Sequence, residues 1–393
     1  MTLRFALSAL AVAGALEAQT TALVGGTVID GTGRPATPNA NVIVTAGRIS
    51  CVGPAAQCPV PSNAARVDVT GRFMTPGLVD AHVHFSQTGW VDGRPDGLSA
   101  PDLYPYARTS RDLRANPARW YRSYLCSGIT AVYDVGGHPW TTTLPARAEN
   151  DLDAPHVRAA GPLITHASRN ALMVDDTLYT FLPMATSADV QASVARLKAM
   201  GSSAVKVWYL APQPARRDEL DARMMETGAA AKAAGLDLIV HATGLREAKV
   251  ALRAGAALLV HSVEDQHVDQ EFIDLLLRNR ATYAPTLTVG RNATRASVAI
   301  GLGEVFPIDD SGACVDSGTV AKIANVEPLR ALLPESRRAV DAGFRRLEAV
   351  GARQAVMAEN LRRVHAAGGA IATATDAATR SRCTARRSSA RWR

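Results

Sequence analysis

The chain has 393 residues, of which 47% are hydrophobic, 20% are charged and 5% are aromatic. This composition excludes a disordered chain, a collagen, a coiled coil and a small disulfide-rich protein, and the length suits one large α/β domain with an appendage. The formal net charge is +7, but residues 377–393 contain six arginines and no acid, so the rest of the chain carries only +1. A nearly neutral body argues against binding to nucleic acid.

The first 18 residues have the pattern of a signal peptide. Arg4 precedes an uncharged apolar run over residues 5–16, and the small residue Ala18 follows. The apolar run is shorter than the ~20 residues that a membrane-spanning helix needs. We therefore expect cleavage after Ala18 and export to the periplasm or the extracellular medium, without stable membrane insertion. A buried N-terminal helix is the alternative interpretation.

Four of the five cysteines are placed in a way that is compatible with export. Cys51 and Cys58 flank a short turn and could close a small loop, and Cys126 and Cys314 could pair across the fold. Such bonds persist in oxidising compartments. The sequence leaves open whether these two pairs form or whether all four thiols are free.

Two patterns follow one another along the chain. Residues 23–30, 40–50 and 65–73 are short β-like runs between turn residues, which predicts a small antiparallel sheet within residues 19–75. In residues 76–376, strand-like and helix-like segments alternate, which is typical of the parallel βαβ units of an α/β fold. Eight strands favour a barrel, and they are expected at residues 78–84, 129–134, 157–160, 204–208, 236–241, 257–261, 282–286 and 370–376.

Helices are predicted between these strands because each helical pattern ends at a glycine or an asparagine. They are expected at residues 218–234, 245–253, 268–278 and 345–365. Residues 290–341 are rich in Gly, Asp and Pro and are longer than a simple connection. We expect them to form an insertion near the mouth of the site.

Polar residues that suit a metal lie where the predicted strands end. His82 and His84 are two residues apart on one strand, so both imidazoles point to the same side. Lys206 interrupts an apolar run, where a buried ammonium is costly unless it is paired or chemically changed. Three further residues each end another strand, and they are His241, His261 and Asp376.

Each of these residues alone has an ordinary structural explanation, such as a core histidine, an ion-paired lysine or a helix-capping aspartate. Together they favour a site, because the carboxyl ends of the strands in a parallel barrel form its active-site face. Independent accidents do not usually place six such groups in succession at strand ends.

The motifs at these positions resemble those of the amidohydrolase superfamily of metal-dependent hydrolases, in the binuclear subtype with a carboxylated lysine. The matching text is MTPGLVDAHVH (74–84), AVKVW (204–208), IVHA (239–242), LVHS (259–262) and ATD (374–376). Within the superfamily, the chain most resembles the imidazolonepropionase-like and prolidase-like members. The resemblance covers residues 22–377 and implies a (β/α)8 TIM-like barrel with a small N-terminal β-sandwich part.

The resemblance also implies two divalent metal ions, for which zinc suits the imidazole and carboxylate ligands. The residues implied for the more buried ion are His82, His84 and Asp376. Those implied for the second ion are His241 and His261, with Lys206, carboxylated by CO2, as the bridge between the two ions.

The implied reaction is hydrolysis of a carbon–nitrogen bond in an amide, a peptide or a cyclic amide. The two ions would make a shared water available as hydroxide and polarise the scissile carbonyl. Asp376 would then carry a proton to the leaving nitrogen. Candidate substrate contacts are His166, Tyr209 and Tyr283. The expected partner is a small-molecule amide or dipeptide, and a homo-oligomer stays open.

The text after Asp376 departs from the family, which continues there with an eighth barrel helix and with strands that return to the small sheet. Residues 377–393 are instead a short basic tail rich in Ser, Thr and Arg. We interpret this tail as frameshifted text. A chain that lacks the last barrel helix and the C-terminal strands is expected to fold poorly or to be inactive.

Two other function classes stay open at this stage. One is a truncated homologue that binds metal or ligand without turnover. The other is a protein that binds nucleic acid or another anionic surface through the basic tail, for which the sign would be strongly salt-sensitive binding.

Overall fold

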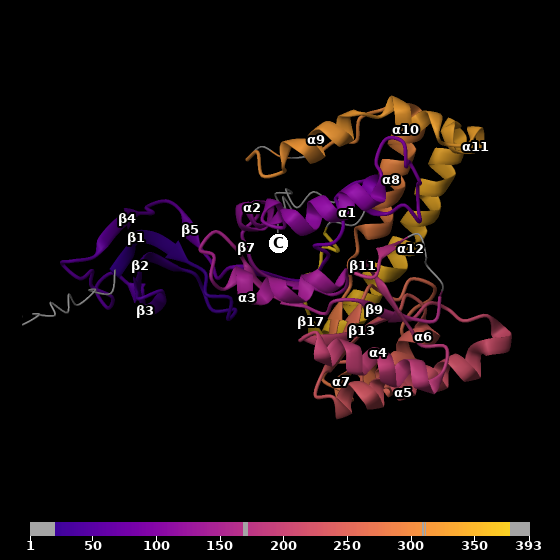
Figure 1. The fold of residues 1–393 in the computed structure, drawn as a ribbon. Coiled ribbons are helices and arrows are strands. Elements are labelled where there is room, and N and C mark those ends of the chain that lie inside the picture. The colour runs from indigo at the N-terminus through magenta and orange to yellow at the C-terminus, as the bar shows by residue number, and fades with distance from the viewer. Residues whose placement is uncertain (1–19, 168–171, 309, 311, 378–393) are drawn as a thin grey trace, which may run out of the picture. The chain divides into compact units, whose positions relative to one another are not determined.

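The computed structural model describes residues 20–167, 172–308, 310 and 312–377, and the chain divides into two compact units, Met1–Gly77 and Leu78–Arg393 (Figure 1). The predicted signal peptide and the tail from residue 378 onward lie outside the described residues. Within the described ranges, no helix combines the length and the apolar character needed to cross a membrane.

The N-terminal unit contains one mixed β-sheet. Its strands are β1 (Thr20–Val28), β2 (Thr37–Thr45), β3 (Arg48–Pro54), β4 (Ala65–Asp68) and β5 (Phe73–Met74). β1 pairs antiparallel with β2, and β2 with β3, but β4 and β5 lie parallel to β1. The prediction of an antiparallel sheet is therefore wrong for these last two strands. The loop between β3 and β4 brings the chain back to the start of β1, so that β4 runs in the same direction as β1.

The predicted single strand over residues 40–50 is also wrong. Ala46 and Gly47 have φ angles of 51° and 73°, which lie in the left-handed region that two-residue hairpin turns require. The chain therefore reverses at these two residues, and the run becomes the paired strands β2 and β3.

The larger unit is built from parallel strands that alternate with helices (Figure 1). One sheet has the order β6-β7-β8 and the other the order β12-β9-β13-β14-β15-β16-β17. The bounds of these strands are β6 Leu78–Val83, β7 Ile129–Asp134, β8 His156–Ala159, β9 Leu163–Thr165, β12 Phe181–Pro183, β13 Ala204–Trp208, β14 Asp237–His241, β15 Leu258–Val260, β16 Thr282–Ala284 and β17 Ala370–Ile371. A small hairpin joins β10 (Met173–Asp175) to β11 (Leu178–Tyr179).

Hydrogen bonds join the two parallel sheets on both sides. Ser203 N, just before β13, donates to Ala159 O at the end of β8 over 3.0 Å. Ala81 N of β6 donates to Thr373 O, just beyond β17, over 2.9 Å, and a parallel bridge pairs Val83 with Ala377. The carboxyl ends of the strands therefore gather on one side of an α/β fold with parallel sheets.

Helices connect the strands. They are α1 (Tyr106–Ala115), α2 (Arg119–Cys126), α3 (Leu144–Ala148), α4 (Ser187–Ala199), α5 (Arg217–Ala233), α6 (Leu245–Arg253), α7 (Gln270–Arg278) and α12 (Val340–Ala366). The segment expected as an insertion contains α8 (Val289–Leu302), α9 (Ser317–Ala324), α10 (Glu327–Ala331) and α11 (Glu335–Arg338). Short 3₁₀ turns occur at η1 (Val91–Gly93), η2 (Pro139–Thr143) and η4 (Pro214–Arg216).

The largest part of the core lies between the sheet and helices α4 to α7. Val205 and Val207 of β13 are fully buried and belong to the same apolar cluster as Leu197 of α4 and Met224 of α5. Burial of each such side chain contributes about 1.5–3 kcal/mol. The strand that carries Lys206 is therefore firmly anchored on its helix-facing side.

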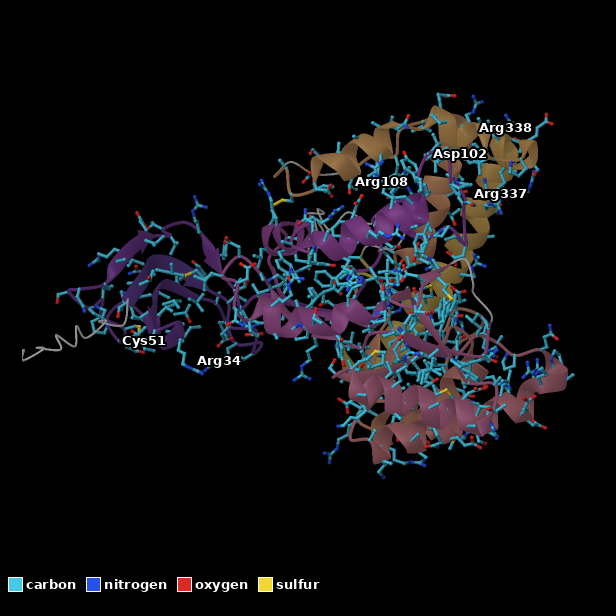
Figure 2. The ribbon with its side chains drawn as sticks, in the orientation of Figure 1. Arg34, Cys51, Asp102, Arg108, Arg337 and Arg338 are labelled. Atoms are coloured by element: carbon cyan, nitrogen blue, oxygen red, sulfur yellow. A yellow bond between two sulfur atoms is a disulfide. The ribbon has the colours of Figure 1, made fainter. Side chains whose placement is uncertain are left out.

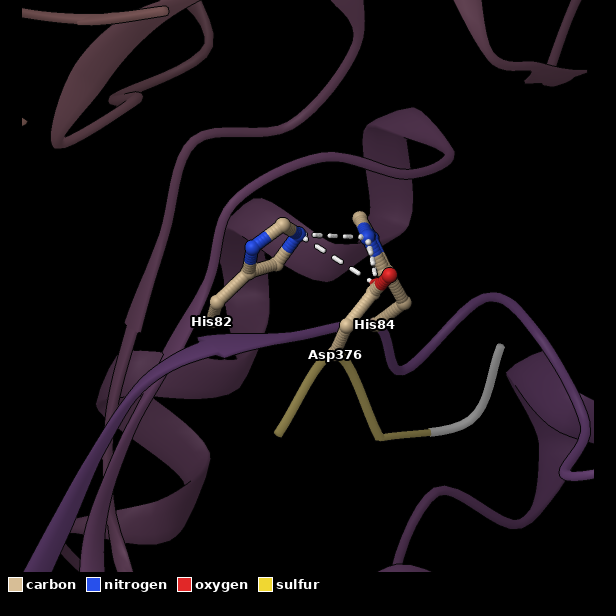
Figure 3. Close-up of side chains that lie close together, drawn as sticks. All are labelled: His82, His84 and Asp376. Carbon is tan, nitrogen blue, oxygen red and sulfur yellow. Dashed lines mark hydrogen bonds and ion pairs between the residues drawn. The ribbon is translucent and has the colours of Figure 1, made fainter. Parts of the chain in front are cut away.

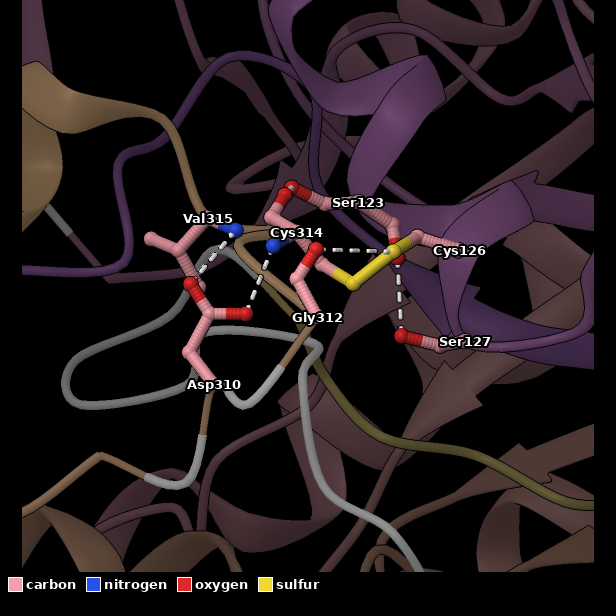
Figure 4. Close-up of a disulfide and its surroundings, with 7 residues drawn as sticks. All are labelled: Ser123, Cys126, Ser127, Asp310, Gly312, Cys314 and Val315. Carbon is pink, nitrogen blue, oxygen red and sulfur yellow. Dashed lines mark hydrogen bonds between the residues drawn. A yellow bond between two sulfur atoms is a disulfide. The ribbon is translucent and has the colours of Figure 1, made fainter.

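Two disulfides are present, Cys51–Cys58 in the small unit and Cys126–Cys314 in the larger unit. The second joins the end of α2 to the loop before α9 (Figure 4). Asp310 orders this loop because its carboxylate accepts hydrogen bonds from Cys314 N (2.6 Å) and Val315 N (3.0 Å). Of the two possibilities that the sequence left open, the structure has the paired cysteines.

Candidate metal centre

Strand β6 carries two histidines to the carboxyl edge of its sheet. His82 and His84 lie on the same side of the strand and point toward Asp376 (Figure 3). Their Nε2 atoms are 3.1 Å apart, and these atoms lie 3.4 Å and 3.1 Å from Asp376 Oδ1. All three residues are buried. We call them the histidine–aspartate cluster.

The backbone after β7 fixes the orientation of one ring of this cluster. His84 Nδ1 lies 2.6 Å from the carbonyl oxygen of Gly136. A carbonyl only accepts, so Nδ1 carries the proton and the Nε2 lone pair of the neutral ring faces the cluster. A side chain at Gly136 would place a Cβ 2.5 Å from Leu163 Cδ2. This close approach explains the glycine.

Asp376 reaches the cluster through an unusual backbone conformation. Its N–H donates to His82 O over 2.7 Å, which ties the segment after β17 to β6. Its φ of 54° lies in the left-handed region, and such a conformation costs on the order of 1–3 kcal/mol for a residue other than glycine. The surrounding hydrogen bonds hold it there.

Three further predicted ligands lie next to this cluster, on successive strands. We call them the lysine–histidine group: Lys206 on β13, His241 at the end of β14 and His261 just after β15. The His261 ring lies 4.4 Å from the His241 ring and 4.8 Å from the His82 ring, measured between centroids. His261 Nδ1 lies 2.8 Å from Thr286 Oγ1. Lys206 is buried and has no hydrogen bond or ion pair within the described part of the chain.

Burial dominates the electrostatics of the site. It lowers the pKa of Lys206 from 10.5 to about 7, against the opposing effect of Asp376 and Asp134. Burial also lowers the pKa values of His82 and His241 well below the ordinary value, and the nearby Lys206 lowers both further. The pKa of His261 is lowered in the same way, by burial and then by His241. Neutral imidazoles, which have a lone pair to offer, are therefore favoured at neutral pH.

The two groups line one cavity of about 340 Å³. Its other walls are mainly apolar and come from Leu163, Leu172, Phe181, Trp208, Val289 and Ala293. The polar residues among the remaining lining residues are Gln87, Arg94 and Thr180. Val289 and Ala293 belong to α8, so the segment expected as an insertion does contribute to the cavity wall.

The three predicted substrate contacts do not line this cavity. The Tyr209 hydroxyl donates to Asp221, which also binds Arg246 at 2.5 Å. The buried Tyr283 hydroxyl accepts from Val263 N over 3.0 Å. His166 Nε2 lies 3.1 Å from Leu210 O and lines a neighbouring cavity of about 320 Å³.

Two residues that bear on the site were missed from the sequence. Arg94 lines the cavity, although it follows His84 by ten residues in an irregular loop. Asp80 lies two residues before His82 and is buried, and its carboxylate accepts hydrogen bonds from His82 N and Thr375 N. The sequence signal for Asp80 is its place as the single acidic residue in the MTPGLVDAHVH motif. No local pattern pointed to Arg94.

The residues fit a divalent cation. One ligand atom from each member of the histidine–aspartate cluster lies within 4.8 Å of the other two. Nitrogen lone pairs and a carboxylate oxygen in this arrangement suit zinc and similar metals. His82 Nδ1 is also buried without a hydrogen-bond partner in the described ranges. A parallel α/β fold with such a cluster at its strand ends defines a candidate metal-binding protein.

Comparison with known proteins finds similarity to imidazolonepropionases. An imidazolonepropionase from Cereibacter sphaeroides is 49% identical over 47 residues, which is 12% of this chain and 12% of that protein. An imidazolonepropionase from Streptomyces coelicolor is 27% identical over 272 residues, 66% of this chain and 65% of that protein. The chain thus spans less than two thirds of the length of either relative. No protein-family model matches the chain.

The fold is shared with solved structures. A Xaa-Pro dipeptidase with bound methionine in the active site has a TM-score of 0.62 and 20% sequence identity, over 92% of this chain and 80% of that chain. At this level of identity the likeness shows that the chain shares the fold of that dipeptidase.

Proposed function

We propose that this protein hydrolyses a carbon–nitrogen bond in a small-molecule amide, dipeptide or cyclic amide. The observation that carries the proposal is the meeting of His82, His84 and Asp376 in one cavity beside the lysine–histidine group. The names of the relatives, which include imidazolonepropionase, a Xaa-Pro dipeptidase and molinate hydrolase, support this bond class.

We also propose the fine structure of the centre and of the fold. The histidine–aspartate cluster would hold one divalent ion, zinc by ligand type, and the lysine–histidine group would hold a second. When bound, such ions supply hydroxide at neutral pH and polarise a carbonyl. The parallel strands would form a (β/α)8 barrel, which the hydrogen bonds between the two sheets support.

The chain's own residues would divide the remaining work. A neutral amine is the form that adds to CO2, and burial brings the pKa of Lys206 to about 7, so carboxylation of Lys206 is accessible at neutral pH. In the presence of the two proposed cations, the resulting anion would be less costly to bury than the amine. Asp376, whose carboxylate faces His82 and His84, would accept the proton of the attacking water and pass it to the leaving nitrogen.

The cavity wall favours a substrate with a carboxylate among the three classes. Arg94 is the single lining residue with a formal charge at neutral pH, apart from Lys206 and Asp376, within the described part of the chain. Asp96 binds its Nε and Nη2 at 2.8 Å and 2.7 Å, which leaves Nη1 without a hydrogen bond to the described residues. An arginine held in this way suits a planar carboxylate. A dipeptide or an N-acyl amino acid supplies one.

Export to the periplasm or the extracellular medium is proposed as well. The two disulfides support it, because such bonds persist in oxidising compartments.

The test combines metal analysis with a substrate panel. All six predicted ligand residues lie in the described part of the chain, so this proposal opposes the expectation that the altered text after Asp376 leaves the chain inactive. The full chain, purified and loaded with zinc, should bind two ions per chain and hydrolyse at least one member of a panel of Xaa-Pro dipeptides, N-acyl amino acids and cyclic amides. Removal of the ions with a chelator should abolish turnover, and added zinc should restore it. A chain that binds no metal would refute the proposal, whereas metal binding without turnover would favour the non-catalytic alternative.

A further inference from the structure

Asp80 lies between the two chain segments that supply the histidine–aspartate cluster. The residue belongs to β6, two positions before His82, and only 1% of its surface is exposed. Asp376 comes from the other segment, just beyond β17. These segments are almost 300 residues apart in the sequence, so no local contact brings their ligands together.

The carboxylate of Asp80 bonds to both segments at once. Oδ1 accepts from His82 N over 3.1 Å and from Thr375 N over 3.0 Å. Oδ2 accepts from the Thr375 hydroxyl. The first donor is the backbone of the candidate ligand His82. The other two belong to Thr375, which directly precedes the candidate ligand Asp376. Hydrogen bonds to a buried carboxylate are stronger than those between neutral groups and fix the positions of their donors.

Regular strand pairing does not extend to the ligand Asp376. β17 itself contains two residues, Ala370 and Ile371, so regular pairing ends well before Asp376. Beyond it, backbone hydrogen bonds join Ala81 to Thr373, Asp376 to His82 and His84 to Ala377. Asp376 also has a left-handed backbone, which needs such support to persist.

We propose that Asp80 is a positioning residue that clamps the segment 373–377 to β6, and thereby sets the distance between Asp376 and the two histidines. The three hydrogen bonds described above join its carboxylate to His82 N and to Thr375. Its effect on metal binding rests on the proposed function, whereas the clamp itself is a property of the fold. The structural alternative is that Asp80 only contributes to stability.

Four variants separate these roles. Asp80→Ala removes the three hydrogen bonds described above, and Asp80→Asn keeps an acceptor for the two backbone donors. Thr375→Val removes only the hydroxyl bond at similar volume, and Thr375→Ser keeps the hydroxyl. The matched control is Thr373→Val, because the Thr373 hydroxyl donates to Val79 O in the same segment without touching Asp80.

Zinc affinity of the tighter site is measured by chelator competition, and loss of partners of metal ligands typically costs 10–100-fold. We expect a loss of about that size for Asp80→Ala, a smaller loss for Asp80→Asn, and near wild-type affinity for Thr375→Ser and Thr373→Val. Asp80→Asn combined with Thr375→Val should be no weaker than the worse single variant, because both act on one contact.

A second readout is independent of metal. Hydrogen exchange of the segment 372–377 in the metal-free full chain should accelerate in Asp80→Ala, while exchange in β13 and β14 stays unchanged. Cobalt-loaded protein adds a spectroscopic check, because a displaced Asp376 should alter the visible absorption of the ion. A purely stabilising role would instead lower the unfolding temperature without any selective change in exchange.

The proposal is overturned if Asp80→Ala keeps both wild-type protection of residues 372–377 and wild-type zinc affinity. Equal losses of affinity in Thr373→Val and Thr375→Val would overturn it as well. Should the wild-type chain bind no metal, the proposed function fails, and the exchange measurement alone then decides whether the clamp exists.

Discussion

The two halves of the candidate centre differ in how far the fold itself assembles them. The histidine–aspartate cluster has its ligand atoms within 4.8 Å of one another, and hydrogen bonds to Gly136 and Asp80 hold its surroundings. The lysine–histidine group shares the cavity, but Lys206 makes no bond there within the described residues, and the two histidines meet only ring to ring.

This difference indicates which half of the centre needs a chemical modification before it can bind metal. Backbone carbonyls and a buried carboxylate are sufficient to arrange two imidazoles and an aspartate. A buried amine has no such partner, and its depressed pKa records the cost of its position. We therefore expect the cluster to bind metal first, and the lysine–histidine group to bind only once Lys206 has become an anion.

The largest expected effect comes from breaking the assembled half. His82→Ala removes one imidazole from the cluster and should lower kcat/KM by about 10³-fold or more, because the proposed metal binding and the proposed proton transfer both depend on this cluster. Metal content measured after dialysis should fall in parallel. The matched control is His156→Ala, whose side chain is 73% exposed and pairs with Glu149 away from the cavity lining. Wild-type turnover by His82→Ala would show that the other half is sufficient.

The second-largest expected effect concerns the lysine–histidine group. Lys206→Met keeps the length of the side chain but removes the amine, so the metal content should fall from two ions to one. The metal-free variant should be more stable than the wild type by about 4 kcal/mol at pH 7, because burial lowers the pKa from 10.5 to about 7 and each pH unit is worth about 1.4 kcal/mol. Denaturant unfolding measures this change.

Lys249→Met is the matched control for that experiment. Asp269 and Glu271 raise the pKa of Lys249 through hydrogen bonds, so its removal should destabilise the chain slightly. If both lysine variants change stability in the same direction, the assignment of a buried, unpaired amine at Lys206 is wrong.

The third effect concerns the cavity beside the lysine–histidine group. Arg94→Met should lower kcat/KM for a dipeptide with a free carboxylate by about 10–100-fold, the size of a lost charged hydrogen bond. The same dipeptide as a carboxamide should be affected less than threefold. Arg108→Met is the control, since Arg108 is exposed on α1 (Figure 2) and its side chain is 81% exposed. Equal losses on both substrates would contradict recognition of a carboxylate.

The smallest effect is a pH dependence of stability. Burial raises the pKa of Tyr283 from 10.0 to about 12, and its hydroxyl accepts from the backbone two residues after His261. The folded state keeps the phenolic proton between pH 10 and 12, whereas the unfolded state releases it. The unfolding free energy should therefore fall by about 1.4 kcal/mol per pH unit in this window.

Tyr283→Phe isolates that contribution, because other buried tyrosines titrate in both proteins. The variant should lose part of the slope, and the difference between the two curves is the quantity to compare. Parallel curves from pH 10 to 12 would mean that the Tyr283 hydroxyl is not buried as described.

Periodicity and turn chemistry were enough to predict much of the fold. The strands at residues 129–134 and 204–208 and the helix at residues 245–253 were predicted with the observed bounds, because apolar runs between helix-ending residues are local signals. The reversal at Ala46 was missed, since a non-glycine residue with positive φ has no strong sequence signature. The parallel return of β4 depends on long-range pairing that the local pattern does not contain.

The candidate site shows the same division. The spacing of His82 and His84 predicts a shared side, and their side chains do share it. The position of Tyr209 at a strand end did not predict where its side chain points, because its hydroxyl donates a hydrogen bond to Asp221 on a neighbouring helix. Asp80 acts across almost 300 residues and Arg94 enters from an irregular loop, so both depend on tertiary contacts that no sequence window spans.

The bond between Cys126 and Cys314 closes a ring of chain with a sequence separation of 188. Lys206, His241 and His261 all lie within that ring. A protease that cuts once between the two cysteines would leave both fragments covalently joined, so the nick would be visible by electrophoresis only after reduction. The ring therefore keeps the second half of the centre attached to the rest of the chain after a single cleavage.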